Sequence, residues 1–260
     1  MSLKKFLRFS VIKFNRYLLH KPFIQIFSGR LKGYLWHTAS NYDYIVGEYE
    51  DPVILDIFLS WFQPDSVFYD VGANIGYYSF LAEQKITSGT IYSFEPMPRN
   101  LALFQQHLHL NKDKIKEGLI ELHPFAISDF EKEVFFSNDP VAVEGNTYIE
   151  MSNKFKNNVD TLKIKCHAID ELVKKGFKPP QVIKIDVEGA EYDVLIGAAG
   201  TIQRYKPKIL LATHDGHFPG IKDKCIALLQ SFGYQLKHTG YFNKHLAGHD
   251  DYIAIYGHKD

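Results

Sequence analysis

From about residue 66 onward the sequence alternates short apolar runs with stretches of helical periodicity, and this alternation constrains the fold more than any other feature. A strand, a helix and a second strand form the unit that builds a parallel sheet, because the helix returns the chain across one face. Residues 129–162 are irregular and are expected to form a hairpin or excursion. The sequence therefore predicts a doubly wound α/β fold. Its expected strands are 67–71, 90–94, 120–125, 181–186, 208–213, 234–238 and 252–256, and its expected helices are 77–84, 98–111, 169–175, 190–199 and 221–232.

The amino-acid composition argues against several classes of protein. The chain has 260 residues, of which 45% are hydrophobic and 15% aromatic, so it can bury a sizeable core and is not intrinsically disordered. Its 30 basic residues balance 30 acidic ones, which argues against a nucleic-acid partner, because that affinity depends on an excess of Lys and Arg. Two cysteines, Cys166 and Cys225, cannot build a disulfide scaffold. Their simplest interpretation is two free thiols in a reducing compartment, and the alternative is one bridge between them.

The zero net charge conceals an uneven distribution. Residues 1–42 contain eight basic residues and no acid, whereas the rest of the chain carries 22 basic and 30 acidic residues. If residues 3–20 form a helix, apolar side chains gather on one face and basic ones on the opposite face. Such a helix either lies on an anionic membrane surface or packs across the domain with a solvated basic face. The sequence shows no secretory signal and no membrane span, so we expect a cytoplasmic protein, peripheral to a membrane if residues 1–20 bind lipid.

Ligands of an open parallel sheet bind beyond the carboxyl ends of its strands, so the residues that follow each expected strand are candidates for a site. The first strand runs into the turn Asp70-Val71-Gly72-Ala73-Asn74-Ile75-Gly76, and the acid Glu95 follows the second strand. Ala126 follows the third strand, and the fourth ends in Asp186-Val187-Glu188-Gly189-Ala190-Glu191. The fifth strand ends at His214 and Asp215. We expect these strand ends to meet at one edge of the sheet.

The first turn and the acid after the second strand predict an adenosine-bearing cofactor. Gly72 and Gly76 allow a tight turn and a close backbone approach to a ligand, and Glu95 is placed to accept hydrogen bonds from ribose hydroxyls. The dinucleotide fingerprint would need glycine where this chain has Asp70. A carboxylate there would repel a pyrophosphate, but it would suit a cofactor that carries an amine and a positive sulfonium. The sequence therefore favours S-adenosylmethionine over NAD.

The same blocks resemble the motif series of FkbM-family methyltransferases. The likeness extends from about residue 47 to residue 256, and its most specific part is Asp186-Val187-Glu188-Gly189-Ala190-Glu191. The resemblance implies a class I, Rossmann-like methyltransferase fold whose sheet has seven strands, the last of them antiparallel. On this basis residues 1–50 form a basic N-terminal helical extension or cap, and residues 51–260 form the S-adenosylmethionine-binding domain.

The resemblance also implies methyl transfer to a hydroxyl, typically of a sugar or a polyketide-type natural product. One departure is that members often carry Glu-x-His at the end of the fifth strand, whereas this chain has Ala212-Thr213-His214, so the histidine is present and the acid is not. Glu50, with Tyr49, either closes over the cofactor or caps the next helix. The expected cofactor-binding residues are Asp70, Gly72, Ala73, Asn74, Gly76, Glu95, Pro96, Ala126 and Glu50.

A sugar hydroxyl is a weak nucleophile at neutral pH, so methyl transfer needs in-line geometry and a general base. The candidate catalytic residues are Asp186, His214 and Glu188. His214 suits proton transfer, but it could equally be a strand-end histidine that hydrogen-bonds to the backbone. Asp186 directly follows a buried strand and needs a partner, which favours a catalytic or orienting role. Glu188 and Glu191 could instead be first-turn acids favoured by the helix dipole, and that interpretation is preferred for Glu191.

A divalent metal is an open alternative. Asp186, His214 and Asp215 would offer oxygen and nitrogen ligands, but single ligands on separate strands are an unspecific pattern, and the metal is not favoured.

The function that the sequence predicts is an O-methyltransferase acting on a hydroxyl of a sugar, glycan or glycosylated natural product. The alternatives are a methyltransferase for a nitrogen or lipid acceptor, and a non-catalytic membrane-associated protein that retains the fold.

Overall fold

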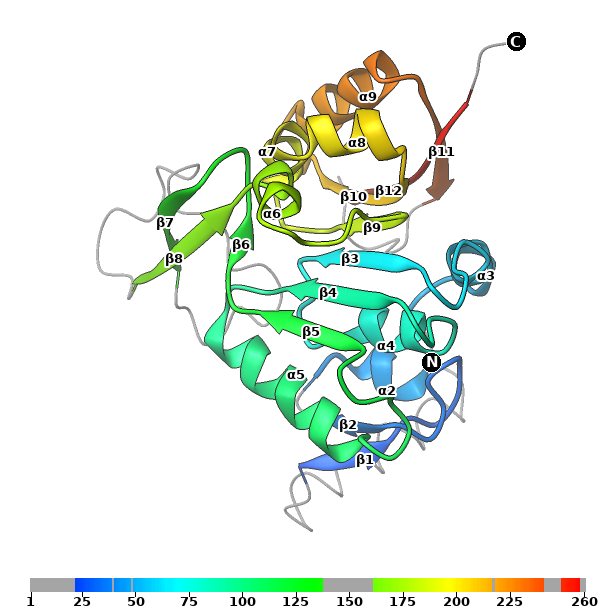
Figure 1. Cartoon of the computed structure of the whole chain (residues 1–260). Coiled ribbons are helices and arrows are strands. Elements are labelled where there is room, and N and C mark those ends of the chain that lie inside the picture. The colour runs from blue at the N-terminus through cyan, green and yellow to red at the C-terminus, as the bar shows by residue number, and fades with distance from the viewer. Residues whose placement is uncertain are drawn as a thin grey trace.

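The computed structural model describes residues 22–38, 40–47, 49–137, 161–216, 218–240 and 249–257. Its main sheet contains β3 (Val67–Val71), β4 (Thr90–Phe94), β5 (Ile120–His123), β9 (Val182–Ile185), β10 (Lys208–His214), β11 (Tyr234–Gly240) and β12 (His249–Tyr256). The order across the sheet is β11-β12-β10-β9-β3-β4-β5 (Figure 1). The strands from β10 to β5 are parallel, and β12 is antiparallel to both of its neighbours. The predicted seven-stranded sheet with an antiparallel last strand is confirmed.

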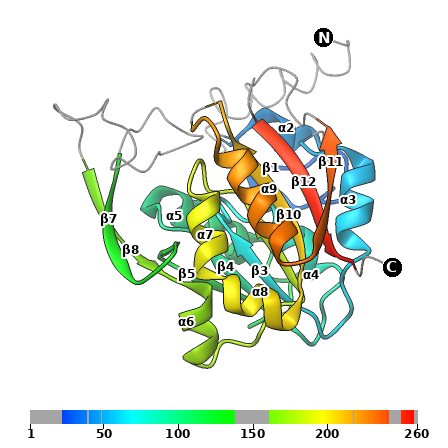
Figure 2. The same cartoon turned by 90° about the horizontal axis from the view of Figure 1, so that it is seen from above.

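The strands at the centre of this sheet are buried on both faces, and alternate residues supply two separate cores. Phe68 and Val182 belong to one core, whereas Tyr69 and Ile183 belong to the other. Helices therefore cover both faces, as Figures 1 and 2 show. One face carries α3 (Pro52–Leu59), α4 (Tyr77–Glu83) and α5 (Pro98–Leu110), and the opposite face carries α6 (Ile169–Lys174), α7 (Glu191–Gly197), α8 (Ala199–Tyr205) and α9 (Ile221–Ser231).

The single helix expected over 190–199 is instead the pair α7 and α8, which meet at Ala198. Two contacts explain the break. A Cβ at Gly197 would lie 2.0 Å from the carbonyl oxygen of Ser128, so this turn presses against another backbone segment. The carboxylate of Asp170 accepts hydrogen bonds from the N–H groups of Gly200 and Thr201 at 2.8 and 2.7 Å. These two backbone donors in the first turn of α8 have no partner within the helix, so Asp170 stabilises the start of α8.

The described part of the N-terminal extension is not wholly helical. It contains β1 (Phe23–Gln25) and β2 (Leu35–His37), which pair antiparallel, and the short helix α2 (Tyr42–Val46). β2 docks beside α5, because the side chain of Asn111 bonds both backbone groups of Leu35 and the ring of Trp36 stacks on that of His107. The predicted basic helix over 3–20 lies outside the described residues. Among the helices that are described, none combines the length and apolarity needed to cross a bilayer.

A separate three-stranded sheet accounts for the irregular region after β5. Here β6 (Ala126–Ile127) pairs parallel with β8 (Thr161–His167), and β7 (Lys132–Ser137) pairs antiparallel with β8. The predicted excursion is thus present, although residues 138–160 lie outside the described range. Cys166 and Cys225 are both buried and form no disulfide with each other.

Gly76 is the N-cap residue directly before α4 and has a left-handed conformation, with φ 97°; a Cβ there would lie 2.4 Å from a ring carbon of Phe104 on α5. We expect Gly76→Ala to lower the free energy of unfolding by roughly 2–5 kcal/mol, through backbone strain and overpacking, as measured by urea denaturation. Gly118→Ala is the matched control, because Gly118 also has positive φ but nothing lies within 4 Å of its added Cβ. That control should lose only about 1–2 kcal/mol, and equal losses in the two variants would contradict the packing role of Gly76.

Candidate functional site

The turn between β3 and α4 is held by backbone contacts to the two neighbouring strands. Gly72 has φ 77°, and a Cβ there would lie 1.9 Å from the carbonyl oxygen of Asp186, so only glycine allows this approach. The N–H groups of Gly72 and Ala73 both donate to the carbonyl oxygen of Phe94 at 3.0 Å. Asn74 follows with φ 50°, a conformation that asparagine tolerates. The turn is therefore fixed at the carboxyl ends of three adjacent strands.

Glu95, directly after β4, fastens this turn to the start of α5. Its carboxylate accepts hydrogen bonds from the N–H groups of Asn74 and Met97, both at 2.9 Å, and from the side-chain amide of Asn100 at 3.2 Å. Burial raises the pKa of Glu95 to about 7, although these donors oppose the shift. A carboxylate offers about four acceptor positions, so one remains at Oε2, the oxygen that Asn74 contacts. Glu95 thus retains capacity for one hydroxyl donor rather than two.

Asp70 lies on β3 with no exposed surface, and its side chain points toward α4 rather than outward from the strand end. Its carboxylate accepts a hydrogen bond from Ser79 Oγ at 2.6 Å and lies 3.6 Å from Lys184 Nζ. Contact between Asp70 and a cofactor therefore stays a prediction. What the structure shows is that Asp70 holds the lysine of a neighbouring strand.

Lys184 of β9 was not among the residues expected at this site. Its Nζ donates to the carbonyl oxygen of Gly72 at 2.8 Å, lies 3.5 Å from Asp186 Oδ2, and sits over the ring of Tyr78. Burial lowers the pKa of Lys184, but Asp186 and Asp70 outweigh that effect, so its pKa is raised and the amine is charged. The signal in the sequence was a lone cation inside a buried apolar strand, which has to find a carboxylate.

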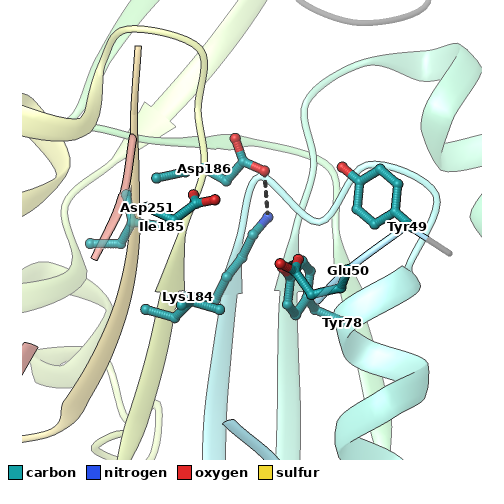
Figure 3. A pocket seen from close by; sticks show the side chains of 9 residues that line it. Tyr49, Glu50, Tyr78, Lys184, Ile185, Asp186 and Asp251 are labelled. Carbon is teal, nitrogen blue, oxygen red and sulfur yellow. Dashed lines mark hydrogen bonds and ion pairs between the residues drawn. The ribbon is translucent and has the colours of Figure 1, made fainter. Parts of the chain in front are cut away.

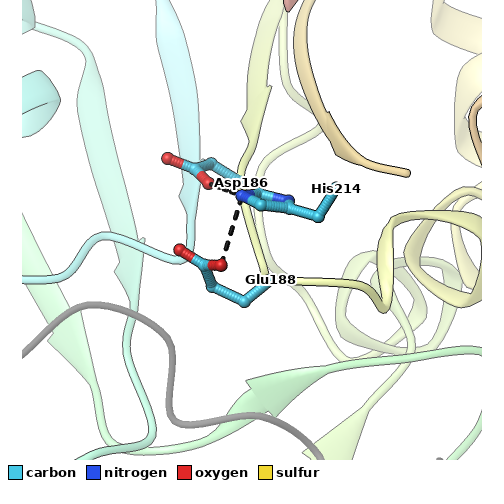
Figure 4. Close-up of side chains that lie close together, drawn as sticks. All are labelled: Asp186, Glu188 and His214. Atoms are coloured by element: carbon cyan, nitrogen blue, oxygen red, sulfur yellow. Dashed lines mark ion pairs between the residues drawn. The ribbon is translucent and has the colours of Figure 1, made fainter. Parts of the chain in front are cut away.

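His214, at the end of β10, meets the carboxylates of Asp186 and Glu188 (Figure 4). Its Nε2 lies 3.6 Å from Asp186 Oδ1 and 3.3 Å from Glu188 Oε2. The three predicted catalytic residues are thus brought together. Burial lowers the pKa of His214, but the hydrogen bond to Glu191 and the charges of Glu188 and Asp186 outweigh it and raise the pKa to about 9. The raised pKa favours the protonated imidazole, which donates rather than accepts hydrogen bonds.

Glu191 reaches this cluster from the start of α7. Its Oε1 lies 2.7 Å from His214 Nδ1 and also accepts a hydrogen bond from the N–H of Gly189 at 2.9 Å. The side chain has no exposed surface. The preferred interpretation of Glu191 as a simple first-turn acid is incomplete, because this residue fixes the orientation of the histidine ring. The tight turn that allows it passes through Glu188 at φ 55° and Gly189 at φ 112°.

A small cavity opens beside Asp186 on the α4 face of the sheet (Figure 3). Figure 3 shows Lys184 pointing toward Asp186, with Asp251 next to them and Glu50 below. Burial and the nearby Asp251 raise the pKa of Glu50 well above its usual range, and the hydroxyl of Tyr78 donates to its carboxylate. The cavity is lined by Tyr49, Glu50, Tyr78, Lys184, Ile185, Asp186, Leu210, Ala212 and Asp251.

The structure decides some of the alternatives for the remaining residues. Glu50 is not the cap of α3, since the side chain of Asp51 accepts the hydrogen bond from Val53 N–H. Asp215 does not join the candidate metal ligands. Its carboxylate accepts hydrogen bonds from the N–H groups of Gly220 and Lys222 at the start of α9, and Glu188 stands in the ligand set instead.

Two further predicted cofactor contacts, Pro96 and Ala126, lie at the edges of this region. Pro96 lies in the turn between β4 and α5, and Ala126 begins β6 of the three-stranded sheet. The expected third strand over 120–125 ends at His123, so Ala126 belongs to a different sheet from the other strand-end residues. Their contact with a cofactor remains a prediction.

The strand order, the antiparallel β12 and the glycine turn after β3 define a class I methyltransferase fold. Solved structures of methyltransferases have a similar fold. An FkbM methyltransferase from Methylobacillus flagellatus aligns with a TM-score of 0.54 at 20% identity, covering 75% of this chain and 44% of that one. An rRNA methylase from Streptococcus thermophilus aligns with a TM-score of 0.51 at 11% identity, covering 80% and 97%. At these identities the likeness concerns the fold alone.

The sequence profile of the methyltransferase FkbM domain matches residues 70–236, well over half of the chain. The chain therefore belongs to the FkbM methyltransferase family. The hexuronic acid methyltransferase AglP of Haloferax volcanii is 29% identical over 151 residues, which cover 58% of this chain and 57% of AglP. Methyltransferase 1 of Beauveria bassiana is 27% identical over 152 residues, which cover 52% of this chain and 59% of that protein. The chain thus spans less than two thirds of each of these relatives.

Removing the charged amine of Lys184 from the centre of the site should destabilise the folded protein. We expect Lys184→Met to lower the free energy of unfolding by about 3–5 kcal/mol in urea denaturation, because Asp70 and Asp186 lose their cation. Adding Asp70→Asn should restore part of that loss, with a coupling energy of roughly 1–3 kcal/mol between the two substitutions. Lys85→Met on the exposed surface is the matched control and should change stability by less than about 0.5 kcal/mol. Additive effects of the two buried substitutions would contradict the ion pair.

Proposed function

We propose that the chain is an S-adenosylmethionine-dependent methyltransferase that methylates a hydroxyl of a sugar, glycan or glycosylated metabolite. The observation that carries the proposal is the position of Asp186. Its carboxylate faces a cavity, and its two oxygens lie beside Lys184 and His214. Family membership supports methyl transfer, and the relative AglP, named a hexuronic acid methyltransferase, supports a sugar acceptor.

The residues around the first turn fit S-adenosylmethionine. Glu95 keeps one acceptor position for a ribose hydroxyl, and the positive φ angles of Gly72 and Asn74 allow the tight turn at the strand ends. The carboxylates of Asp186 and Glu188 at the same edge favour a cofactor with a positive sulfonium. When bound, that cofactor would supply an electrophilic methyl group. The chain's own residues have to position the acceptor oxygen and receive its proton.

Asp186 is placed to do both. Its side chain is 25% exposed, so an acceptor hydroxyl that enters the cavity could donate a hydrogen bond to it. Lys184 and His214 flank the carboxylate and restrict its orientation, which keeps it directed at the cavity. Tyr49 and Glu50 line the same cavity from the N-terminal side, so the lead-in to the first strand contributes to the acceptor side of the site.

An acceptor screen tests the reaction. The protein is incubated with methyl-labelled S-adenosylmethionine and a panel of neutral sugars, uronic acids, amino sugars and glycolipids, and products are read by mass spectrometry. We expect a methyl group on a hydroxyl of at least one sugar, and Asp186→Asn should reduce the rate by about 10²–10⁴-fold. Methylation of amine nitrogen alone, or full activity of Asp186→Asn, would contradict the assignment.

Cofactor binding can be measured without an acceptor. Glu95→Ala should weaken S-adenosylmethionine binding at least tenfold in isothermal titration, which corresponds to about 1.4 kcal/mol, because a ribose hydroxyl loses its acceptor and Asn74 loses an anchor. Glu121→Ala, on the exposed surface of β5, is the control and should bind like the unmodified protein. Circular dichroism confirms that both variants are folded. Equal affinities in all three proteins would remove Glu95 from the cofactor site.

A further inference from the structure

The side chains of Asp186, Glu188 and His214 present one ligand atom each within 4.8 Å of one another. Two atoms that share a metal ion at 2.0–2.2 Å lie roughly 3–4.4 Å apart. The distances from His214 Nε2, 3.6 Å to Asp186 Oδ1 and 3.3 Å to Glu188 Oε2, fall within that interval. Little movement would therefore bring all three atoms onto one ion.

The histidine is oriented as metal-binding histidines are. A metal-ligating imidazole almost always bonds a carboxylate or carbonyl through its other ring nitrogen, which fixes both the ring and the coordinating nitrogen. Here Glu191 Oε1 lies 2.7 Å from Nδ1, so Nε2 is directed at the two carboxylates, as Figure 4 shows. His214 is 3% exposed and Glu191 has no exposed surface, so this arrangement is held inside the protein.

The cluster gathers several carboxylates around one histidine. Three carboxylates, from Asp186, Glu188 and Glu191, surround one imidazole, and Lys184, the cation beside Asp186, is shared with the buried Asp70. In the described part of the chain, Glu191 Oε2 is also a buried oxygen without a hydrogen-bond donor. A divalent cation between these carboxylates would offset part of their mutual repulsion.

We propose that Asp186 Oδ1, Glu188 Oε2 and His214 Nε2 bind a divalent cation. Two carboxylate oxygens and one imidazole nitrogen suit a first-row ion such as Mn²⁺, since carboxylates favour Mg²⁺ and Mn²⁺ while imidazole favours the transition metals. Three protein ligands leave positions open for water or for an acceptor hydroxyl. That last step rests on the proposed function, whereas binding of the ion does not.

Binding of Mn²⁺ to the full chain, first stripped with a chelator, tests the site without cofactor or acceptor. Isothermal titration of the unmodified protein should show one ion per chain. Glu188→Gln and Glu191→Gln should each weaken binding about 10–100-fold, the first by removing a ligand and the second by releasing the histidine ring. Asp193→Asn is the matched control, because Asp193 is also an acid in the first turn of α7 but does not belong to the ligand set, and its affinity should stay within twofold.

A second measurement locates the ion. Mn²⁺ is paramagnetic and should broaden the ring proton signals of His214 in the NMR spectrum before those of His107, which is buried beside Trp36. Glu188 is partly exposed in the loop before α7, so Glu188→Gln is expected to fold, and its melting curve checks this. Absence of Mn²⁺ binding at millimolar concentration, or equal affinity in Glu188→Gln and Asp193→Asn, would overturn the proposal. A protein that binds Mn²⁺ but methylates no hydroxyl would overturn the proposed acceptor and leave the metal site standing.

Discussion

The buried amine of Lys184 is the contact on which the geometry of the strand ends depends. It joins β9 to β3 through Asp70, to the following turn through the carbonyl oxygen of Gly72, and to the cavity through Asp186. A charge in this position is costly to desolvate, and removing one member of such a group leaves the others unpaired. The contacts that compensate the desolvation of Lys184 therefore also fix the position of the turn relative to Asp186.

A second constraint comes from the glycines, which set how closely the elements approach. Gly72 allows the turn after β3 to touch the backbone of Asp186, and Gly189 lets the chain reverse so that Glu191 returns to His214. A Cβ at Gly189 would lie 2.0 Å from the ring of Phe218. These positions are structural requirements of the site. They place the charged side chains of the site close to one another.

The sequence was sufficient for the sheet and for the gathering of Asp186, Glu188 and His214, because parallel strands end at one edge and the motifs follow those ends. It was insufficient for contacts that depend on side-chain direction. Lys184 could not be assigned a partner until the face of β9 was known, and Glu191 required the unusual backbone of the preceding turn. The β1–β2 sheet was missed because its three-residue strands carry little pattern of their own and are stabilised by α5.

The acid that family members often carry two residues before the histidine is replaced in this chain by Ala212, yet a carboxylate still occupies that side of the cavity. Ala212 pairs directly with Asp251 across the antiparallel β10–β12 ladder, and paired residues project from the same face of a sheet. Both residues line the cavity beside Asp186. The pairing of β12 with β10 therefore places the acid Asp251 opposite Ala212. A departure from a linear motif can thus leave the charge of a site in place, because the register of neighbouring strands provides a second route to the same position.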